Sequence, residues 1–475
     1  MTEPTGSPQH LVEHALATST ADECLAIASD HTSANLRWAN NTLTTNGVMH
    51  GLSVTVVSFV RTTGGVASGS VSGSASSREQ VTALVEAADA AARAASPAED
   101  AADLIPADLV PADLVPAEAA ADWDDAPGAT DIHVYDTFAP ALGDAFTRAG
   151  SAGRVLYGFV NHEVTTTYLG STTGLRRRHV QPTGHYGCTG KTADLARSAW
   201  VGGATRDFTD VDAHVMEATL EQRLGWGERQ VDLTAGRYDT ILPPSAVADL
   251  MIDAYWYAGG RTAHEGQSVY SRRGGGTRVG ERIAREGVDL YSDPAYPGLE
   301  CAPFNLATTS GNEESVFDNG LPLGRTDWVR DGRLTSLLQS RHSAALTGQP
   351  VTPMIDNLVL DVAEGHGSIE DVVAGTERGL LLTCLWYIRE VDPQVLLLTG
   401  LTRDGVYLVE DGEITGEVNN FRFNESPVDL LNRFTHASAT VPSFSREWGD
   451  DYFSRTATPA LRVPDFNMSS VSQAR

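Results

Sequence analysis

A series of apolar segments near the C-terminal end constrains the fold more than any other part of the chain. Residues 379–426 (GLLLTCLWYIREVDPQVLLLTGLTRDGVYLVEDGEITGEVNNFRFNES) hold segments rich in Leu, Val, Ile, Tyr and Trp. These segments are separated by Asp392-Pro393, Arg403-Asp404-Gly405 and Glu410-Asp411-Gly412. Asp-Gly between such segments indicates a tight hairpin. The stretch therefore predicts an antiparallel meander that forms the core of the C-terminal half.

The pattern within the meander also predicts which strands are covered. Residues 380–387 are nearly all apolar, which indicates a central strand that is buried on both faces. Residues 406–409 and 414–418 alternate between apolar and polar side chains, which indicates half-exposed strands. The meander itself carries no chemistry, so functional residues are expected elsewhere.

The N-terminal half predicts a second antiparallel sheet with long helices against it. Its strand patterns are β-branched and punctuated by Asn and Gly, and its helical patterns are rich in alanine with apolar residues at helical spacing. Strand patterns occur at residues 23–29, 52–60 and 154–170, and helical patterns at residues 9–18, 76–95 and 138–149.

Residues 96–127 interrupt these patterns. The segment contains IPADLVPADLVPA, in which a Pro-Ala-Asp-Leu-Val unit recurs. Proline every five residues excludes a long helix, so we predict an acidic, extended loop or linker. Further along, Pro243-Pro244 and then Ser245, an acceptable N-cap, predict a helix that runs to Tyr257 and stops before Gly259-Gly260.

Charge and cysteine usage narrow the class of protein. The chain has 34 Lys plus Arg against 62 Asp plus Glu, a net charge of −28, which disfavours nucleic acid and anionic membranes as partners. Cys24, Cys188, Cys301 and Cys384 form no CxxC pair, so a disulfide framework or a Cys-rich zinc module is not indicated. No signal-peptide pattern and no membrane-spanning apolar run occurs. We expect a soluble, cytoplasmic protein.

Motifs for metal or nucleotide chemistry are incomplete. A zinc hydrolase typically carries two histidines about one helical turn apart with a glutamate between them. His162-Glu163 and His264-Glu265 begin such a motif, but VTTT and GQSV follow, and neither supplies the second histidine. The Gly-rich residues 272–282 lack the order of a phosphate-binding loop, so no nucleotide cofactor is implied.

One further cluster of nitrogen and sulfur ligands is present. His179, His185 and Cys188 lie within ten residues, HVQPTGHYGC, and could approach one metal ion from a loop. The Pro-Thr-Gly between them equally indicates a turn with incidental side chains. Both interpretations remain open at this point.

Several of these segments together resemble the TldD/TldE (PmbA) family of cytoplasmic metallopeptidases over nearly the whole chain. The N-terminal part of the resemblance lies in ANLRWANNTLTTNGVMHGLSVTVV, and the C-terminal part in four further segments. These are GQSVYSRRGGGTRVGERIA, SVFDNGLPLGRTDWVRDGRL, GSIEDVVAGTERGLLLT and GVYLVEDGEITGEV.

The resemblance implies an α+β protein with two parts. The first, residues 1–220, is a mixed α/β domain with an antiparallel sheet, long helices and the acidic loop 96–127. The second, residues 221–475, is a β-rich, barrel-like domain. These boundaries are expectations that follow from the family.

The resemblance also implies where a zinc site is expected. In the catalytic TldD branch a helix carries HExxxH, and a cysteine near the C-terminus completes the site. The matching window here is Met-Ile-Asp-Ala-Tyr-Trp, so Met251 and Trp256 stand at the histidine positions, Ile252 at the glutamate position and Asp253 beside them. The cysteine region matches residues 442–448, PSFSREW, which contain no cysteine, and Cys384 lies on the meander instead.

This chain is therefore similar to the TldE branch, whose members lack the motif and partner a TldD subunit. The resemblance implies a metal-free subunit of a heterodimer, with zinc in the HExxxH-bearing partner and short or unfolded peptides as substrates. Two alternatives stay open: a self-sufficient peptidase that uses His179, His185, Cys188 and His264 as relocated ligands, and a non-enzymatic peptide-binding or assembly module.

Overall fold

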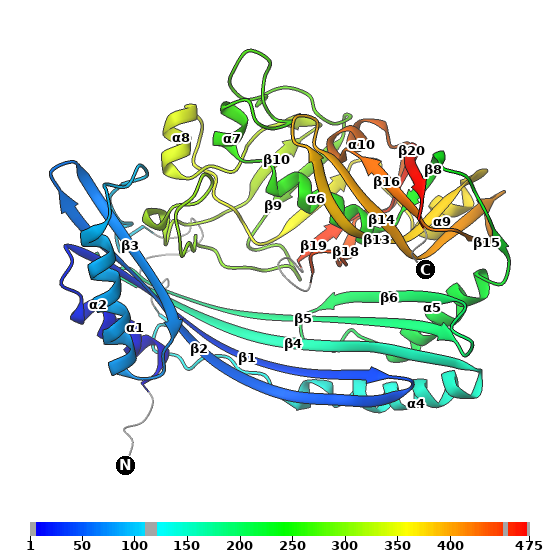
Figure 1. Ribbon diagram of the computed structural model, residues 1–475, viewed down its shortest axis with the longest axis horizontal. Coiled ribbons are helices and arrows are strands. Elements are labelled where there is room, and N and C mark those ends of the chain that lie inside the picture. Colours follow the sequence, from blue (N-terminus) through cyan, green and yellow to red (C-terminus); the bar gives the residue numbers. More distant parts are fainter. Residues whose placement is uncertain (1–5, 110–120, 450–454, 473–475) are drawn as a thin grey trace.

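The computed structural model describes residues 6–109, 121–449 and 455–472, which form three sheets with helices packed against them (Figure 1). The helices are α1 (Pro8–Thr18), α2 (Arg78–Ala94), α4 (Phe138–Ser151), α5 (Ala213–Trp226), α6 (Pro244–Trp256), α7 (Gly260–His264), α8 (Arg341–Thr347), α9 (Ile369–Ala374) and α10 (Pro427–Arg433), with the 3-10 turns η1 (Ile132–Tyr135) and η2 (Val316–Asp318). The strands of the first half are β1 (Glu23–Ala39), β2 (Thr42–Thr62), β3 (Gly65–Ser74), β4 (Arg154–Ser171), β5 (Arg176–Thr192) and β6 (Ser198–Thr205). The remaining strands are β7 (Gln230–Val231), β8 (Gly236–Leu242), β9 (Val288–Ser292), β10 (Thr326–Arg330), β11 (Arg333–Leu334), β12 (Leu358–Val362), β13 (Arg378–Asp392), β14 (Leu397–Glu410), β15 (Glu413–Val418), β16 (Phe421–Glu425), β17 (His436–Ala437), β18 (Val441–Ser443), β19 (Thr456–Thr458) and β20 (Leu461–Val471).

The first sheet is a long antiparallel platform with the order β3-β2-β1-β4-β5-β6. Successive side chains of a strand point to opposite faces, and the even-numbered residues of β1 face the helices. Ala26 and Ala28 lie in one core with residues of α1 and α2, and Leu36 and Trp38 lie in another with residues of α4 and α5. The helices predicted at residues 9–18, 76–95 and 138–149 are confirmed as α1, α2 and α4.

The opposite face of this sheet is covered by segments from the second half of the chain (Figure 1). The odd-numbered Leu25 and Ile27 of β1 share a core with Val316 and Phe317. The rings of Phe59 and Phe317 lie 4.8 Å apart between their centroids. Because apolar side chains fill this contact, the two halves of the chain share a hydrophobic core there.

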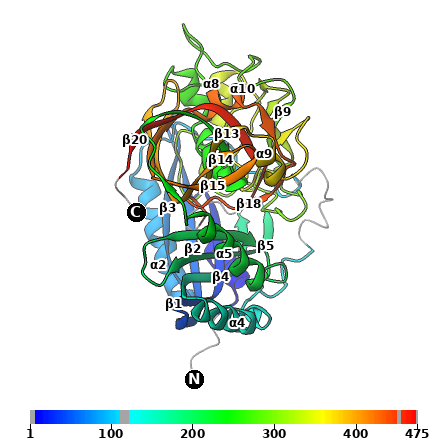
Figure 2. The same cartoon turned by 90° about the vertical axis from the view of Figure 1, so that its right-hand side faces the viewer.

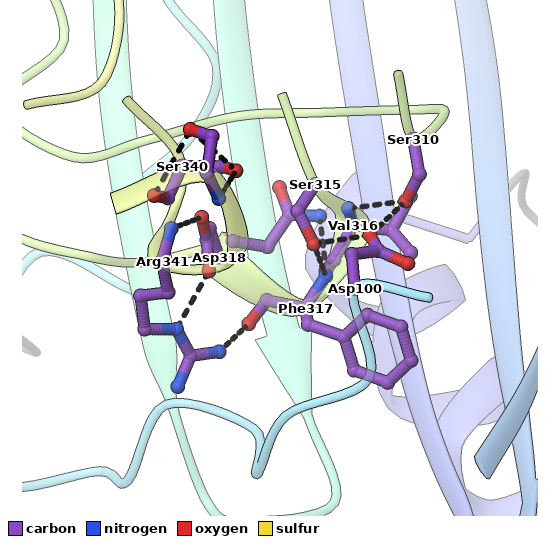
Figure 3. A network of polar contacts seen from close by, with 10 residues as sticks. Asp100, Ser310, Ser315, Val316, Phe317, Asp318, Ser340 and Arg341 are labelled. Atoms are coloured by element: carbon purple, nitrogen blue, oxygen red, sulfur yellow. Dashed lines mark hydrogen bonds and ion pairs between the residues drawn. The ribbon is translucent and has the colours of Figure 1, made fainter. Parts of the chain in front are cut away.

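Polar contacts surround that shared core (Figure 3). One carboxylate oxygen of Asp100 accepts hydrogen bonds of 2.6 Å from the hydroxyls of both Ser310 and Ser315. Arg341 donates from Nε to Asp318 at 2.6 Å and from its backbone N–H to the same carboxylate at 2.9 Å. The Asp100 bonds join the start of the 3-10 turn η2 to the loop that follows α2, and the Arg341 bonds join η2 to the start of α8.

The second half contains a six-stranded sheet, β11-β10-β9-β12-β19-β18, and a larger sheet that closes on itself. In the larger sheet β13, β8, β20, β16 and β14 pair in this order, and β13 pairs with β14 to close a five-stranded barrel. Figure 2 shows these strands curving around a common centre. The expected α+β class with a barrel-like C-terminal part is confirmed.

The predicted meander is present as β13 to β16, with one difference. The chain turns at Asp392-Pro393 and at Asp411-Gly412, as expected. The turn expected at Arg403-Asp404-Gly405 is wrong, because β14 continues through it. Asp404 and Gly405 have φ angles of 51° and 122°, and the register between β13 and β14 shifts opposite them, so the dipeptide forms an irregularity within a strand.

The expected half exposure of residues 406–409 is also wrong. Tyr407 and Val409 are buried against Val372 and Val373 of α9, with Trp226 at the edge of the cluster. Val406 and Leu408 point to the other side, into the barrel core. The alternating pattern concealed this burial because a short helix, α9, covers the face that was expected to meet water.

The loop predicted at residues 96–127 is confirmed where it is described, since residues 96–109 and 121–127 contain neither helix nor strand. Part of it, residues 110–120, lies outside the described residues. Leu104 and Ile105 are buried in the shared core, so this end of the loop is anchored. Within the described ranges, no helix is long and apolar enough to cross a membrane.

Replacing Phe317 by alanine tests the shared core. Phe317 is 1 % exposed, and truncation of a buried aromatic ring leaves a cavity, so we expect Phe317→Ala to lower the free energy of unfolding by about 3–5 kcal/mol. Urea unfolding followed by circular dichroism measures this change. Leu346→Ala is the control, because Leu346 is 49 % exposed, and a loss as small as the control's for Phe317→Ala would contradict the shared core.

Candidate functional site

Helix α6 carries the window that the family resemblance assigns to zinc ligands. It begins at Pro244, two residues before the expected start, because Pro243 rather than Ser245 is its N-cap. Residues 246–255 are all buried. A helix that is buried all round is a core element rather than a surface one. Met251 and Ile252 are each 0 % exposed and lie in the main core of the second half.

The second region implied by the resemblance, residues 442–448, lies directly beside α6. Ser445 donates from its hydroxyl to Oδ1 of Asp249 at 2.5 Å, and the backbone N–H of Glu447 donates to the same oxygen at 3.1 Å. The rings of Trp256 and Trp448 meet edge to face, with centroids 5.0 Å apart. The fold therefore brings the two regions together, and an aromatic pair and a hydrogen-bonded carboxyl join them.

Two buried aspartates of α6, Asp249 and Asp253, lie at this contact. Oδ2 of Asp249 and Oδ2 of Asp253 are buried without a hydrogen-bond partner among the described residues. Burial raises the pKa of Asp249 well above its usual value. Burial raises the pKa of Asp253 to about 7; the Trp448 side chain opposes this rise, the nearby Glu447 carboxylate reinforces it, and Arg389 opposes it more weakly.

The Glu447 carboxylate is bound by strand β13. It accepts the backbone N–H groups of Tyr387 and Ile388 at 2.8 and 2.9 Å, and it lies 3.4 Å from Nη1 of Arg389. Of these acids, only Asp253 was among the residues singled out from the sequence. The available signal was a pair of carboxyls four residues apart, Asp249 and Asp253, on a helix that is otherwise apolar.

The residues at this position do not fit a zinc ion. Zinc takes imidazole, thiolate or carboxylate ligands in a tetrahedral set, and a buried Met, an Ile and an indole do not supply them. Across the described ranges, no group of three or more His, Cys, Asp and Glu side chains is placed to hold a metal ion. The absence of a metal in this chain remains a prediction.

The alternative ligands do not gather in one place. His179, His185 and Cys188 all lie on β5, whose pairing with β4 is regular. Cys188 is an even-numbered residue of the strand, whereas His179 and His185 are odd-numbered, so its side chain lies on the opposite face of the sheet, in the core with α4 and α5. Burial raises the pKa of the Cys188 thiol to about 12. His185 faces the second half and stacks on Phe444. His264 is exposed at the end of α7.

His162, the first residue of the other incomplete motif, is buried and hydrogen-bonded within the fold. It is 5 % exposed, and its two ring nitrogens contact the hydroxyl of Thr130 at 2.6 Å and the carbonyl of Arg206 at 2.8 Å. Burial lowers its pKa, which favours the neutral ring. With both nitrogens engaged, this histidine has no free ligand atom.

Arg446 connects the two halves of the chain next to α6, and no sequence pattern pointed to it. Its guanidinium lies 4.6 Å from the ring centroid of Trp200 on β6 and 5.1 Å from that of Trp386 on β13. It forms an ion pair of 2.7 Å with Asp404 and contacts Sγ of Cys384 at 2.6 Å. The Cys384 thiol is buried, which raises its pKa to about 12 and makes it a poor nucleophile.

A cavity of about 590 Å³ lies next to this junction. Strands β5 and β6 form one side of it, and β18, the start of α6 and residues 298–300 form the other. His179 is among the residues that line it, together with Phe444 of the segment that follows β18. The cavity is thus bounded by both halves of the chain and by the segment that contacts α6.

Comparison with known proteins agrees with this architecture. A sequence profile of the PmbA/TldA metallopeptidase C-terminal domain matches residues 235–470. TldE from Thermococcus kodakarensis is similar in structure, with 17 % identity, a TM-score of 0.72 and coverage of 97 % of this chain and 99 % of that chain. No curated protein matches the sequence.

Two further solved structures, each described as a proposed modulator of DNA gyrase, share the fold. The structure from Bacteroides thetaiotaomicron has 13 % identity and a TM-score of 0.73, with 98 % of each chain covered. That from Thermotoga maritima has 16 % identity and a TM-score of 0.70, with 97 % of this chain and 99 % of that chain covered.

The profile match and the common fold define a protein with a metallopeptidase-type C-terminal part of the PmbA/TldA class. The chain belongs to the TldD/TldE (PmbA) family, as the sequence resemblance indicated.

Asp253→Asn tests the buried carboxyl. An unfolded aspartate ionises near pH 3.8, whereas Asp253 ionises at about 7 in the folded protein, so the unfolded state loses its proton first. Asp253 therefore costs no stability below about pH 4, and its cost grows up to about pH 7 and then stays constant. We expect Asp253→Asn to raise the free energy of unfolding at pH 8, by roughly 4 kcal/mol at most, and to leave it almost unchanged at pH 4.

Urea unfolding at both pH values measures this difference. Asp144→Asn, on the exposed side of α4, is the matched control and should give no such pH dependence. An equal effect of Asp253→Asn at pH 4 and pH 8 would show that the carboxyl is not held protonated.

Proposed function

We propose that this chain is a TldE-like subunit that binds no metal and partners a TldD-type zinc subunit. The two chains together would degrade or process short or unfolded peptides. In this role the chain helps to enclose the peptide, and the partner supplies the metal and its chemistry.

One observation carries this proposal. At the window where a TldD subunit has HExxxH, Met251 and Ile252 are buried in the apolar core and Trp256 packs on Trp448. A lone subunit with these side chains lacks the nitrogen ligands and the general base of a zinc peptidase. The family's hydrolytic chemistry then requires a second chain.

The free edge of β2 supports the partnership. Strand β3 pairs only with residues 53–62 of β2, so within the described ranges no strand covers the outer edge of residues 42–51. Leu43, Val48 and Met49 are 48 %, 52 % and 61 % exposed there. Residues 38–60 contain no Lys, Arg, Asp or Glu, although the chain has a net charge of −28. Proteins commonly protect such an edge with charges or cover it with another chain.

Co-expression with a TldD-type subunit tests the proposed activity. We expect the mixture to cleave an unfolded peptide and each chain alone to leave it intact. A chelator should abolish the cleavage, and zinc should bind in proportion to the partner and not to this chain. Chelator-sensitive cleavage by this chain alone, or tightly held stoichiometric zinc in it, would contradict the proposal.

Charge placed on the β2 edge tests the docking surface. The double variant Val48→Lys, Met49→Lys should weaken association with the TldD-type subunit by at least about tenfold, because desolvating a lysine at a core contact opposes binding. Its thermal midpoint should stay near that of the wild type, since both side chains are exposed. Val215→Lys on α5, where Val215 is 62 % exposed, is the control, and an equal effect of both variants would contradict this surface.

A further inference from the structure

The cavity between β6 and β18 is rich in arginine in a chain that is otherwise acidic. Arg206, Arg223 and Arg455 all line it, and Asp210 and Glu300 are the carboxylates that line it among the described residues. The basic side chains come from different elements, so they surround the cavity rather than lie on one surface strip. The basic lining of the cavity contrasts with the net charge of the whole chain, which is −28.

Among the described residues, two of the three arginines have no carboxylate partner. Arg206 lies 3.7 Å from Glu300, and both side chains are substantially exposed. Asp210 accepts a hydrogen bond from the hydroxyl of Thr205. Arg223 and Arg455 form no ion pair with any carboxylate of the described residues, so within those residues neither guanidinium is directly paired with an anion.

Arg223 is the more buried of these two charges. It reaches from α5 toward β6 and donates from Nη1 to the carbonyl of Trp200, a neutral acceptor. Burial lowers its pKa, because the guanidinium has lost water, and the more distant Glu370 carboxylate offsets that loss only in part. An anionic ligand would compensate, since a bidentate pair with a carboxylate is the interaction that guanidinium groups make best.

Arg455 approaches the same cavity from the segment before β19. It donates from Nε to the carbonyl of Asp356 at 2.9 Å and from Nη1 to the hydroxyl of Thr183 at 3.2 Å. These bonds hold the side chain without neutralising it, and no described residue accepts a hydrogen bond from its Nη2. Helix α6 also begins at the cavity, with Pro243, Pro244 and Ser245 in its lining, and the positive end of a helix dipole favours anions.

We propose that this cavity binds a carboxylate of a peptide, with Arg223 and Arg455 as the groups that recognise it. The carboxylate is either the C-terminal group of the peptide or an acidic side chain, because both present the same planar pair of oxygens. This assignment rests on the proposed function in that it takes a peptide as the ligand. It adds that peptides with an accessible carboxylate are preferred.

Binding of matched peptides to the isolated full-length chain tests the site. One ten-residue peptide of Gly, Ser and Ala carries a free C-terminal carboxylate, the second a C-terminal amide, and the third the amide with one internal Glu. Isothermal titration at low salt gives the affinities. We expect the two carboxylate-bearing peptides, or one of them, to bind at least about tenfold more tightly than the neutral amide.

Substitutions assign that preference to the two arginines. Arg223→Gln and Arg455→Gln should each remove most of the difference between the acidic and neutral peptides, and Arg223→Lys should retain part of it. Arg273→Gln is the control, because Arg273 is exposed on the Gly-rich loop and is not among the residues that line the cavity. Thermal midpoints verify folding, and if Arg223→Gln unfolds, the less buried Arg455→Gln carries the test.

Equal affinity for all three peptides, or a preference that survives both glutamine variants, would overturn the assignment. The assay involves no partner and no cleavage, so its failure is distinguishable from failure of the proposed function. That function fails when the co-expressed pair does not associate or does not cleave. A pair that cleaves acidic and neutral peptides equally well through an unselective cavity would overturn only the carboxylate site.

Discussion

The all-round burial of α6 is the constraint on which the rest of the second half depends. Every residue from 246 to 255 is buried, so the helix has no solvent face and must match the elements around it. Strands β13, β18 and β19 and helix α10 all pack against it. Any polar atom on such a helix needs a partner within the protein. Asp249 obtains one through Ser445 and Glu447, and this bond places the segment after β18 beside the helix.

The burial of α6 explains how apolar and aromatic side chains at residues 251–256 can maintain the fold. Met251 and Ile252 contribute apolar volume to the core, and Trp256 meets Trp448 where a metal-binding relative would place ligands around an ion. Burying the Met251 and Ile252 side chains, which are both 0 % exposed, stabilises the fold by roughly 1.5–3 kcal/mol each. The remaining carboxyls, Asp249 and Asp253, stay protonated more readily than exposed aspartates, because burial disfavours their charged form.

The sequence predicted long regular elements well and the site only in part. Helices α1, α2 and α4 were found because their apolar positions recur at helical spacing over three turns or more, and the turns at Asp392-Pro393 and Asp411-Gly412 because their residues select turn conformations. Asp404-Gly405 has similar composition, yet neighbouring strands continue the pairing on both sides of it. The burial of residues 406–409 depends on α9 and α5, which are distant in sequence, so no local pattern reports it.

The residues of the site divide in the same way: those in one continuous segment can be predicted from the sequence, and contacts between distant segments cannot. The window that the resemblance aligns with HExxxH, at Met251, Ile252 and Trp256, can be located in the sequence because it is continuous. Contacts such as Trp200 with Arg446 join residues more than two hundred positions apart, and no spacing rule reaches that far.

The segment from Pro442 to Trp448 links the two features that matter for function. Its later residues, Ser445, Glu447 and Trp448, contact α6 or strand β13, whereas its first residues line the cavity next to β6. Phe444 in the middle stacks on His185 of the first sheet. A change in how this segment packs on α6 would therefore alter the wall of the cavity. The window that the resemblance aligns with HExxxH and the arginine-lined cavity are therefore in contact with one and the same segment of seven residues.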